Sequence, residues 1–320
     1  MQGKLILRIS RGEYKGNAVW FMRQAGRYLP DYERIRAGMN FSDVLENAEV
    51  IYNLSILPLK YIRTDGIVVF TDILLPLKEM GYTVSYDGGI TVRKNGEGGA
   101  QYSGISTAIG RLSRDFKDFT IIGVLGGPFT MLSYVFDEGR HGYHVTKKEI
   151  VERGEELMPR AIECILNFAE IQARAGVDVL QVFDSWLGNL SESFYERHVR
   201  KWEEYFMEKL GEIGKPVIFF SEGTYHLAGA IKNLEADVFS VDWRVDLNRY
   251  LDTLGNRIIQ GNLDPNVLST SDSYLRDEVR RIMNMGRKFP GHIFNLGHGV
   301  PQWADWNKLA MIADEVHNYD

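Results

Sequence analysis

Two arginines, Arg23 and Arg27, follow an apolar run near the amino terminus of the chain. The run spans Val19–Met22, and Pro30 closes the segment. A short apolar run of this kind predicts a buried strand. Because a guanidinium group stays protonated in proteins, the end of this strand would aim fixed positive charge at an anionic ligand. The alternative is a solvated pair that makes surface salt bridges.

Polar and aromatic residues also follow the later apolar runs. Each has an ordinary explanation: a carboxylate or hydroxyl can cap a helix or begin a turn, and a tyrosine can pack in the core with its hydroxyl bonded to backbone. His298, between two glycines, is equally suited to bind a metal, to donate a proton or to act as a hydrogen-bonded spacer. In chain order the set is Asp72, Tyr134, Asp184, Ser185, Trp186, Asp242, Trp243, Asn262, Asp264, Asn295 and His298.

Eight apolar runs, most of them followed by a helical pattern, would position these groups. Fully apolar strands that alternate with helices predict a parallel sheet covered on its outside. Eight such units are the number in a (β/α)8 barrel, so we expect an α/β fold, a single TIM barrel over residues 1–320. A doubly wound open sheet is the alternative, but no Gly-x-Gly-x-x-Gly follows the first run. The runs lie near residues 18–22, 67–70, 120–125, 177–183, 217–220, 238–241, 258–260 and 292–294, and a hairpin pattern spans 81–93.

In a barrel of this type the loops that follow the strands form one face, and active sites lie on that face. The polar residues named above would therefore gather there, although they are far apart in the sequence. The face would hold two cations, several carboxylates and one histidine. This shared location is the argument for a site.

Composition narrows the classes of ligand and location. The net charge is −6 and the pI is about 5.7, whereas general nucleic-acid or anionic-membrane binders are usually more basic. The lone cysteine, Cys164, lies in an apolar helical pattern, so we expect a core residue and no disulfide, zinc or iron–sulfur site. No run has the length of a signal peptide or a membrane span. We expect a cytoplasmic protein that binds neither nucleic acid nor membrane.

The ordered motifs resemble those of the uroporphyrinogen decarboxylase family. Trp20–Pro30 is similar to the long amino-terminal signature of that family. Phe129 stands where the family usually has tryptophan, and residues 135–141 are less rich in glycine than the corresponding loop. The further similar segments are Phe70–Leu74, Gly126–Tyr134, Phe183–Trp186, Val241–Trp243, Gln260–Pro265 and Asn295–Gly299.

The resemblance implies a barrel without cofactor or metal that removes carboxyl groups from the four acetate side chains of uroporphyrinogen III, giving coproporphyrinogen III. It also implies a homodimer in which the two active-site faces turn toward each other. It implies catalytic roles for Arg23 and Asp72. The implied substrate-binding residues are Arg23, Gln24, Ala25, Gly26, Arg27, Asp72, Tyr134, Ser185 and His298.

Physical chemistry agrees with these implied roles. An ionised Asp72 can only accept hydrogen bonds, so it suits the inward-pointing N–H groups of the macrocycle and the positive charge that forms when a pyrrole carbon is protonated. Each arginine contact with a substrate carboxylate would contribute about 1.5–3 kcal/mol. The resemblance favours Arg23 as the proton donor, whereas His298 is the better acid by its ordinary pKa of about 6.5.

Two rival functions are a corrinoid-dependent methyltransferase of the same superfamily and a non-catalytic tetrapyrrole-binding protein. The methyltransferases bind zinc through a histidine and cysteines, which Cys164 alone cannot supply. Retention of both Arg23 and Asp72 argues against a protein that only binds.

Overall fold

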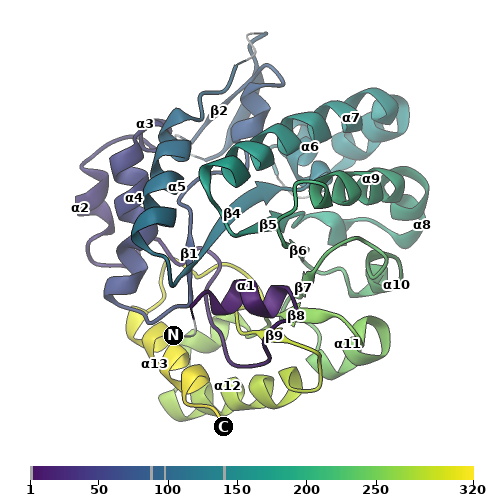
Figure 1. Ribbon diagram of the computed structural model, residues 1–320. Helices are drawn as coiled ribbons and strands as arrows, with labels where there is room; N and C mark the ends of the chain where they lie inside the picture. Colours follow the sequence, from purple (N-terminus) through teal and green to yellow (C-terminus); the bar gives the residue numbers. More distant parts are fainter. Residues whose placement is uncertain (1–2, 87–88, 97–98, 140–141) are drawn as a thin grey trace.

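Seven parallel strands form one curled sheet in the computed structural model, which describes residues 3–86, 89–96, 99–139 and 142–320 (Figure 1). Each strand pairs with the next one around the sheet, and the register sets Gly66 opposite Thr120 and Ile122 opposite Val179. The strands, in sheet order, are β1 (Gly66–Val68), β4 (Thr120–Gly126), β5 (Val179–Phe183), β6 (Val217–Phe220), β7 (Val238–Ser240), β8 (Ile258–Gln260) and β9 (His292–Ile293).

The first apolar run occupies the eighth position and joins the two edges of this sheet. Val19 forms a parallel bridge with Phe294, just beyond β9. On the side of β1, the Val19 carbonyl accepts from the Asp65 amide at 2.8 Å, and the Val19 amide donates to the Asp65 carboxylate at 2.8 Å. The predicted TIM-barrel architecture is confirmed. The expected strand at 18–22 is wrong in extent: only Val19 forms a β-bridge. The Asp65 side chain takes the place of a backbone acceptor on one side, and the chain turns at Arg23.

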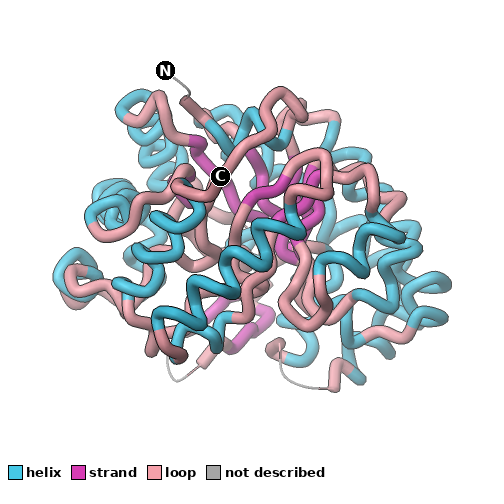
Figure 2. Tube along the Cα trace, turned by 90° about the horizontal axis from the view of Figure 1, so that it is seen from below, coloured by secondary structure: helices cyan, strands magenta, loops and turns pink. Residues whose placement is uncertain are grey.

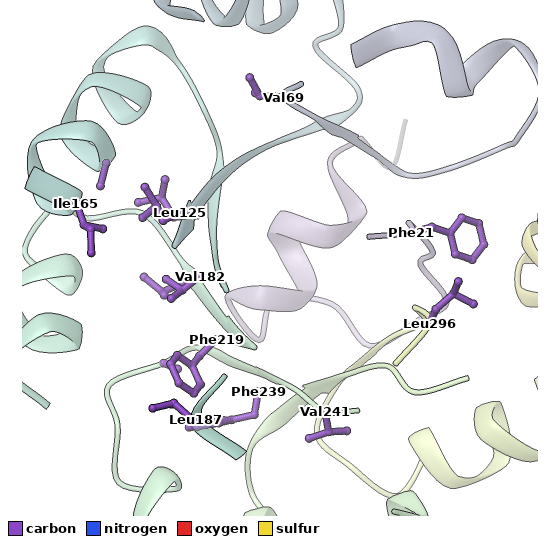
Figure 3. Close-up of a cluster of buried hydrophobic side chains, with 14 of the residues drawn as sticks. Phe21, Val69, Leu125, Ile165, Val182, Leu187, Phe219, Phe239, Val241 and Leu296 are labelled. Carbon is purple, nitrogen blue, oxygen red and sulfur yellow. The ribbon is translucent and has the colours of Figure 1, made fainter. Parts of the chain in front are cut away.

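Helices surround the sheet, as predicted for strands that are apolar on both faces. Figure 2 shows the strands in the interior of a ring of helices. In Figure 3, Leu125, Val182 and Phe219 point away from the barrel axis and lie near Ile165 and Leu187, in one buried cluster. The main outer helices are α4 (Ala48–Ile56), α5 (Ser103–Asp115), α6 (Pro128–Asp137), α7 (His144–Ala175), α9 (Arg200–Gly211), α11 (Leu247–Leu254), α12 (Asp272–Gly286) and α13 (Trp306–His317).

A short helix, α1 (Leu5–Ser10), covers the amino ends of the strands (Figure 1). Its Ile6 and Ile9 are buried against the inward-facing side chains of the sheet. The Leu7 amide donates to the Thr120 hydroxyl at the start of β4, at 3.2 Å. The barrel is thus filled with apolar groups at this end. The inward-facing partners of α1 are Trp20, Ile122, Val179, Ile218, Val238 and Ile293.

A polar layer lies inside the barrel above this apolar packing. The Trp20 indole donates to the Gln260 amide oxygen at 2.8 Å. The Gln260 amide nitrogen donates to Gln181 at 3.0 Å and to the Ser240 hydroxyl at 2.9 Å. Because these buried groups are bonded to one another, the layer carries polar atoms at little cost. Functional groups must therefore lie beyond it, at the carboxyl ends of the strands.

The predicted hairpin is confirmed by the antiparallel pair β2 (Tyr82–Ser85) and β3 (Thr91–Lys94). Part of its expected turn, at 87–88, lies outside the described residues, as do residues 140–141 of the loop after Tyr134. Cys164 is buried in α7, as expected. Among the described helices, none combines the length and apolar character needed to cross a membrane.

Candidate active site

Arg23 lies on a turn with unusual backbone geometry. Its φ is 59°, in the left-handed region that non-glycine residues rarely adopt. Gln24 holds the turn: its side chain accepts from the Phe21 amide at 3.2 Å and donates to the Gly66 carbonyl at 2.9 Å. The Tyr28 hydroxyl donates to the Gln24 carbonyl. Such a backbone costs about 1–3 kcal/mol, and here it leaves the Arg23 side chain exposed at the barrel end while Gln24 is buried.

The remaining residues of the arginine segment face different surroundings. Ala25 and Gly26 are half-buried beside Arg23. The Arg27 side chain is 59% exposed and its Nε lies 3.5 Å from the Glu33 carboxylate. Arg27 therefore matches the surface-pair alternative in this conformation. Contacts of Gln24, Ala25, Gly26 and Arg27 with a substrate stay predictions.

Asp72 follows β1, and the loop after it brings the carboxylate toward the hairpin. The carboxylate accepts from the Leu74 amide at 2.7 Å and from the Tyr86 hydroxyl. Burial raises the pKa of Asp72, while the Leu74 amide, the Tyr86 hydroxyl and the Arg23 guanidinium act in the opposite direction. Asp72 can therefore cap the following turn and also bind a ligand, because one carboxylate has about four acceptor positions.

Tyr134 lies on α6, in the second turn after the helix start at Pro128. Burial raises the pKa of Tyr134, the Asp72 carboxylate raises it further, and the Arg23 guanidinium lowers it. These influences place the hydroxyl within electrostatic reach of both Arg23 and Asp72. The Tyr134 ring also packs closely against Gly139, where an added Cβ would lie 2.5 Å from the ring.

Asp184 connects the end of β5 to the start of α6. Its carboxylate, fully buried, accepts from the Phe129 amide at 3.2 Å and from the Thr130 amide at 2.7 Å. The Thr130 hydroxyl in turn accepts from the Trp186 amide at 3.1 Å. Asp184 is therefore the cap of the helix that carries Tyr134. Ser185, the next residue, is half-buried at the barrel end.

His298 lies between two close approaches that its flanking glycines allow. A Cβ at Gly297 would lie 2.3 Å from the Trp243 amide nitrogen, and one at Gly299 would lie 2.5 Å from Arg23 Cδ. The imidazole also lies edge-on to the ring of Trp243, with centroids 6.0 Å apart. The two glycines thus bring Trp243 and Arg23 to either side of the histidine.

The imidazole of His298 is surrounded by charged groups. Its Nε2 lies 3.5 Å from the Glu222 carboxylate. Burial lowers the pKa of His298, and the guanidinium groups of Arg23 and Arg244 lower it further, while Glu222 acts in the opposite direction. With a pKa below its ordinary value, the ring is mostly neutral at pH 7.

The structure brings together Arg23, Asp72, Tyr134 and His298 at the carboxyl ends of the strands. Sequence reasoning missed three neighbours: Tyr86, Glu222 and Arg244. Glu222 and Arg244 follow β6 and β7, so the same strand-end rule would have found them. Tyr86 gave no such signal, because it follows a hairpin strand outside the barrel sheet.

Comparisons with known proteins agree on one family of sequences. The family model described as uroporphyrinogen decarboxylase (URO-D) matches residues 1–319. The uroporphyrinogen decarboxylase of Thermodesulfovibrio yellowstonii is 35% identical over 317 residues, covering 94% of this chain and 93% of that protein. The one from Aquifex aeolicus is 33% identical and covers 98% of each chain. A solved methyltransferase from Methanosarcina mazei has a TM-score of 0.80 at 13% identity, covering 97% of this chain and 96% of its own, a likeness of fold alone.

Proposed function

This chain belongs to the uroporphyrinogen decarboxylase family, and we propose that it converts uroporphyrinogen III to coproporphyrinogen III. Each of the four acetate side chains would lose CO2 and become a methyl group. The observation that carries the proposal is the convergence of Arg23, Asp72 and His298 at one end of the barrel, around positions that suit a ring with many carboxylates.

Asp72 is the proposed ligand of the ring centre. Its carboxylate keeps free acceptor positions beside the bonds from Leu74 and Tyr86. The pyrrole N–H groups of the macrocycle would donate to them. When a pyrrole carbon is protonated, the same carboxylate would stabilise the positive charge that spreads over the ring.

The proposed chemistry consumes one proton for each acetate. Protonation of the pyrrole carbon next to the acetate creates an electron sink, the bond to the carboxylate breaks, and CO2 leaves. The exocyclic methylene then takes up a proton as the ring carbon loses its own, so a methyl group remains. Arg23 is the proposed donor on the resemblance of its segment to that of the family. Because a guanidinium ordinarily stays protonated, the proton it gives would have to be returned at once, and its exposed position would let water do so.

Tyr134, Ser185, His298 and the arginine segment are the proposed partners of the substrate carboxylates. A neutral imidazole suits this role, because it can donate one N–H to a carboxylate without the cost of charging a buried ring. The lowered pKa of His298 leaves less of the ring protonated at pH 7, which counts against it as the proton donor.

The direct test is incubation of the purified protein with uroporphyrinogen III under reducing conditions. The products are then oxidised and separated by their number of carboxylates. Stepwise loss from eight carboxylates to four is expected. Binding without conversion would contradict the proposed reaction and favour the tetrapyrrole-binding alternative.

The family also motivates proposals on assembly and location. We propose a cytoplasmic homodimer with the two active-site faces opposed. Analytical ultracentrifugation tests the assembly: a mass twice the 36.6 kDa of the chain is expected, and a monomer at assay concentration would contradict it.

A further inference from the structure

A third guanidinium group, that of Arg244, lies at the same end of the barrel, after β7. It packs 4.1 Å over the ring of Trp243. It forms ion pairs with Asp242 at 2.8 Å and with Glu222 at 2.6 Å. Even so, 46% of its side chain is exposed. Arg244 is thus a cation held in a fixed orientation that still has donors available to a ligand.

His298 lies between this cation and Arg23. Arg23 approaches it through Gly299, and Trp243, on which Arg244 rests, approaches it through Gly297. The pKa of His298 is lowered by both guanidinium groups, as expected for a ring between two cations. A carboxylate beside the imidazole would therefore be stabilised from both directions.

Glu222 already occupies a position of this kind. One of its oxygens bonds Arg244, and the other lies 3.5 Å from Nε2 of His298. Its side chain is 15% exposed, so it is mostly buried but can still be reached from solvent. Asp242, by contrast, is buried and is also bonded by the backbone amides of Gly223 and Arg244. Asp242 would hold the arginine in place while Glu222 moves.

We propose that Arg244 and His298 form a second carboxylate-binding position of the site, which Glu222 fills until a carboxylate arm of the ligand replaces it. This inference rests on the proposed function for its ligand class, a ring that carries carboxylate arms on several sides. One arm reaches the segment around Arg23 while another reaches Arg244. A ligand with eight carboxylates then depends on Arg244 more strongly than one with four, because more of its arms can reach that position.

The test compares Arg244→Gln with the matched control Arg249→Gln. Arg249 also lies over an aromatic ring, 5.3 Å from that of Tyr225, but on α11. Binding of uroporphyrin (eight carboxylates) and coproporphyrin (four) is measured by fluorescence, since these oxidised rings are not turned over. The KM and kcat for uroporphyrinogen III are measured alongside.

For Arg244→Gln we expect about tenfold weaker uroporphyrin binding, the low end for a charge-assisted contact because Arg244 is half exposed. We expect a smaller loss for coproporphyrin, a raised KM and a kcat within about twofold. Glu222→Gln should tighten uroporphyrin binding, because the competing negative charge is gone. The control should match the wild type.

The outcomes separate this inference from the proposed function. If Arg244→Gln binds both porphyrins as the control does while the wild type decarboxylates, the inference is overturned and the proposed function stands. If the wild type binds uroporphyrin through Arg244 but converts no uroporphyrinogen, the binding position is supported and the proposed reaction fails. A kcat loss without a change in binding would also overturn the inference.

Discussion

The two ends of the barrel differ in what their side chains do. At the amino end, α1 and the inward-facing residues of the sheet pack without charge, and the polar layer above them is internally bonded. At the carboxyl end, three groups lie close together: Arg23 with its left-handed backbone, the Asp72 carboxylate with a raised pKa, and His298 between two cations. The apolar packing of the amino end contributes stability that offsets the cost of the Arg23 backbone and of the buried carboxylate at the carboxyl end.

Replacing Arg23 tests this division most strongly. Arg23→Ala should lower turnover of uroporphyrinogen by about a thousandfold or more, because the proposed proton donor and a carboxylate contact are lost together. The melting temperature should change little, since the side chain is exposed and alanine keeps the same left-handed turn. Product chromatography and calorimetry measure the two effects, with Arg34→Ala, an exposed arginine on α2 (Tyr32–Arg36), as the control.

His298→Asn separates the two candidate donors. Asparagine keeps an N–H for a carboxylate, so we expect a KM raised about tenfold and a kcat that falls far less than in Arg23→Ala. If His298→Asn alone removes activity while product binding persists, the assignment of Arg23 is wrong and the histidine is the acid.

A substitution at the amino end should lower stability and leave activity nearly unchanged. Ile9→Ala removes a fully buried side chain of α1 and should lower the free energy of unfolding by about 2–4 kcal/mol. The kcat/KM of the folded enzyme should stay within about twofold of the wild type, because the change lies at the far end of the barrel. Urea unfolding and the porphyrinogen assay at low temperature test this, and a matching loss of kcat/KM would break the comparison.

Near the carboxyl end of the barrel, the buried pair Asp184 and Glu203 makes the free energy of unfolding depend on pH. Both side chains are fully buried, and burial raises the pKa of each, to about 6 for Asp184. The folded state therefore holds a proton that the unfolded chain releases above about pH 4. Stability must then fall as the pH rises through this range, because the folded state binds more protons.

Glu203→Gln tests this sign. Glutamine has no titratable proton, so the decline of unfolding free energy between pH 5 and pH 8 should be smaller than in the wild type by about 1–2 kcal/mol. Urea unfolding at the two pH values measures it. A steeper decline in the variant would show that the pair is ionised and separately stabilised.

Tyr86→Phe should have the smallest effect. The hydroxyl lowers the pKa of Asp72, so its loss should move the acidic limb of the kcat/KM profile to higher pH. At pH 7 the rate should fall by about twofold to fivefold, the worth of one hydrogen bond. A limb that moves to lower pH would mean that Tyr86 does not stabilise the ionised carboxylate.

Much of the fold was readable from the sequence because the strands are continuous apolar runs. Seven of the eight runs became strands of one parallel sheet. The first did not, since its partner at one edge is the Asp65 side chain, which no pattern of hydrophobicity encodes. The helix α1 was missed because six residues are too few to show a helical period.

The sequence predicted where the site lies but not which way its side chains point. Asp72, Tyr134 and His298 were found because they follow strands or the turns after them. The different surroundings of Arg23 and Arg27 could not be read from their spacing, because the left-handed turn sends the two side chains to different neighbours. Glu222 and Arg244 also follow strands, but the sequence prediction named no residue after the run at 217–220, and only Asp242 and Trp243 after the run at 238–241.

The close approach of Arg23 and Gly299 determines when the site can form during synthesis of the chain. The two residues are 23 and 299 in the sequence, so the ribosome makes the first long before the second. The nascent chain can order most of its sheet before then, but the two sides of His298 meet only when the last strand docks beside the first run. A chain that stops before Gly299 therefore lacks one side of the candidate site, even where most of the sheet can form.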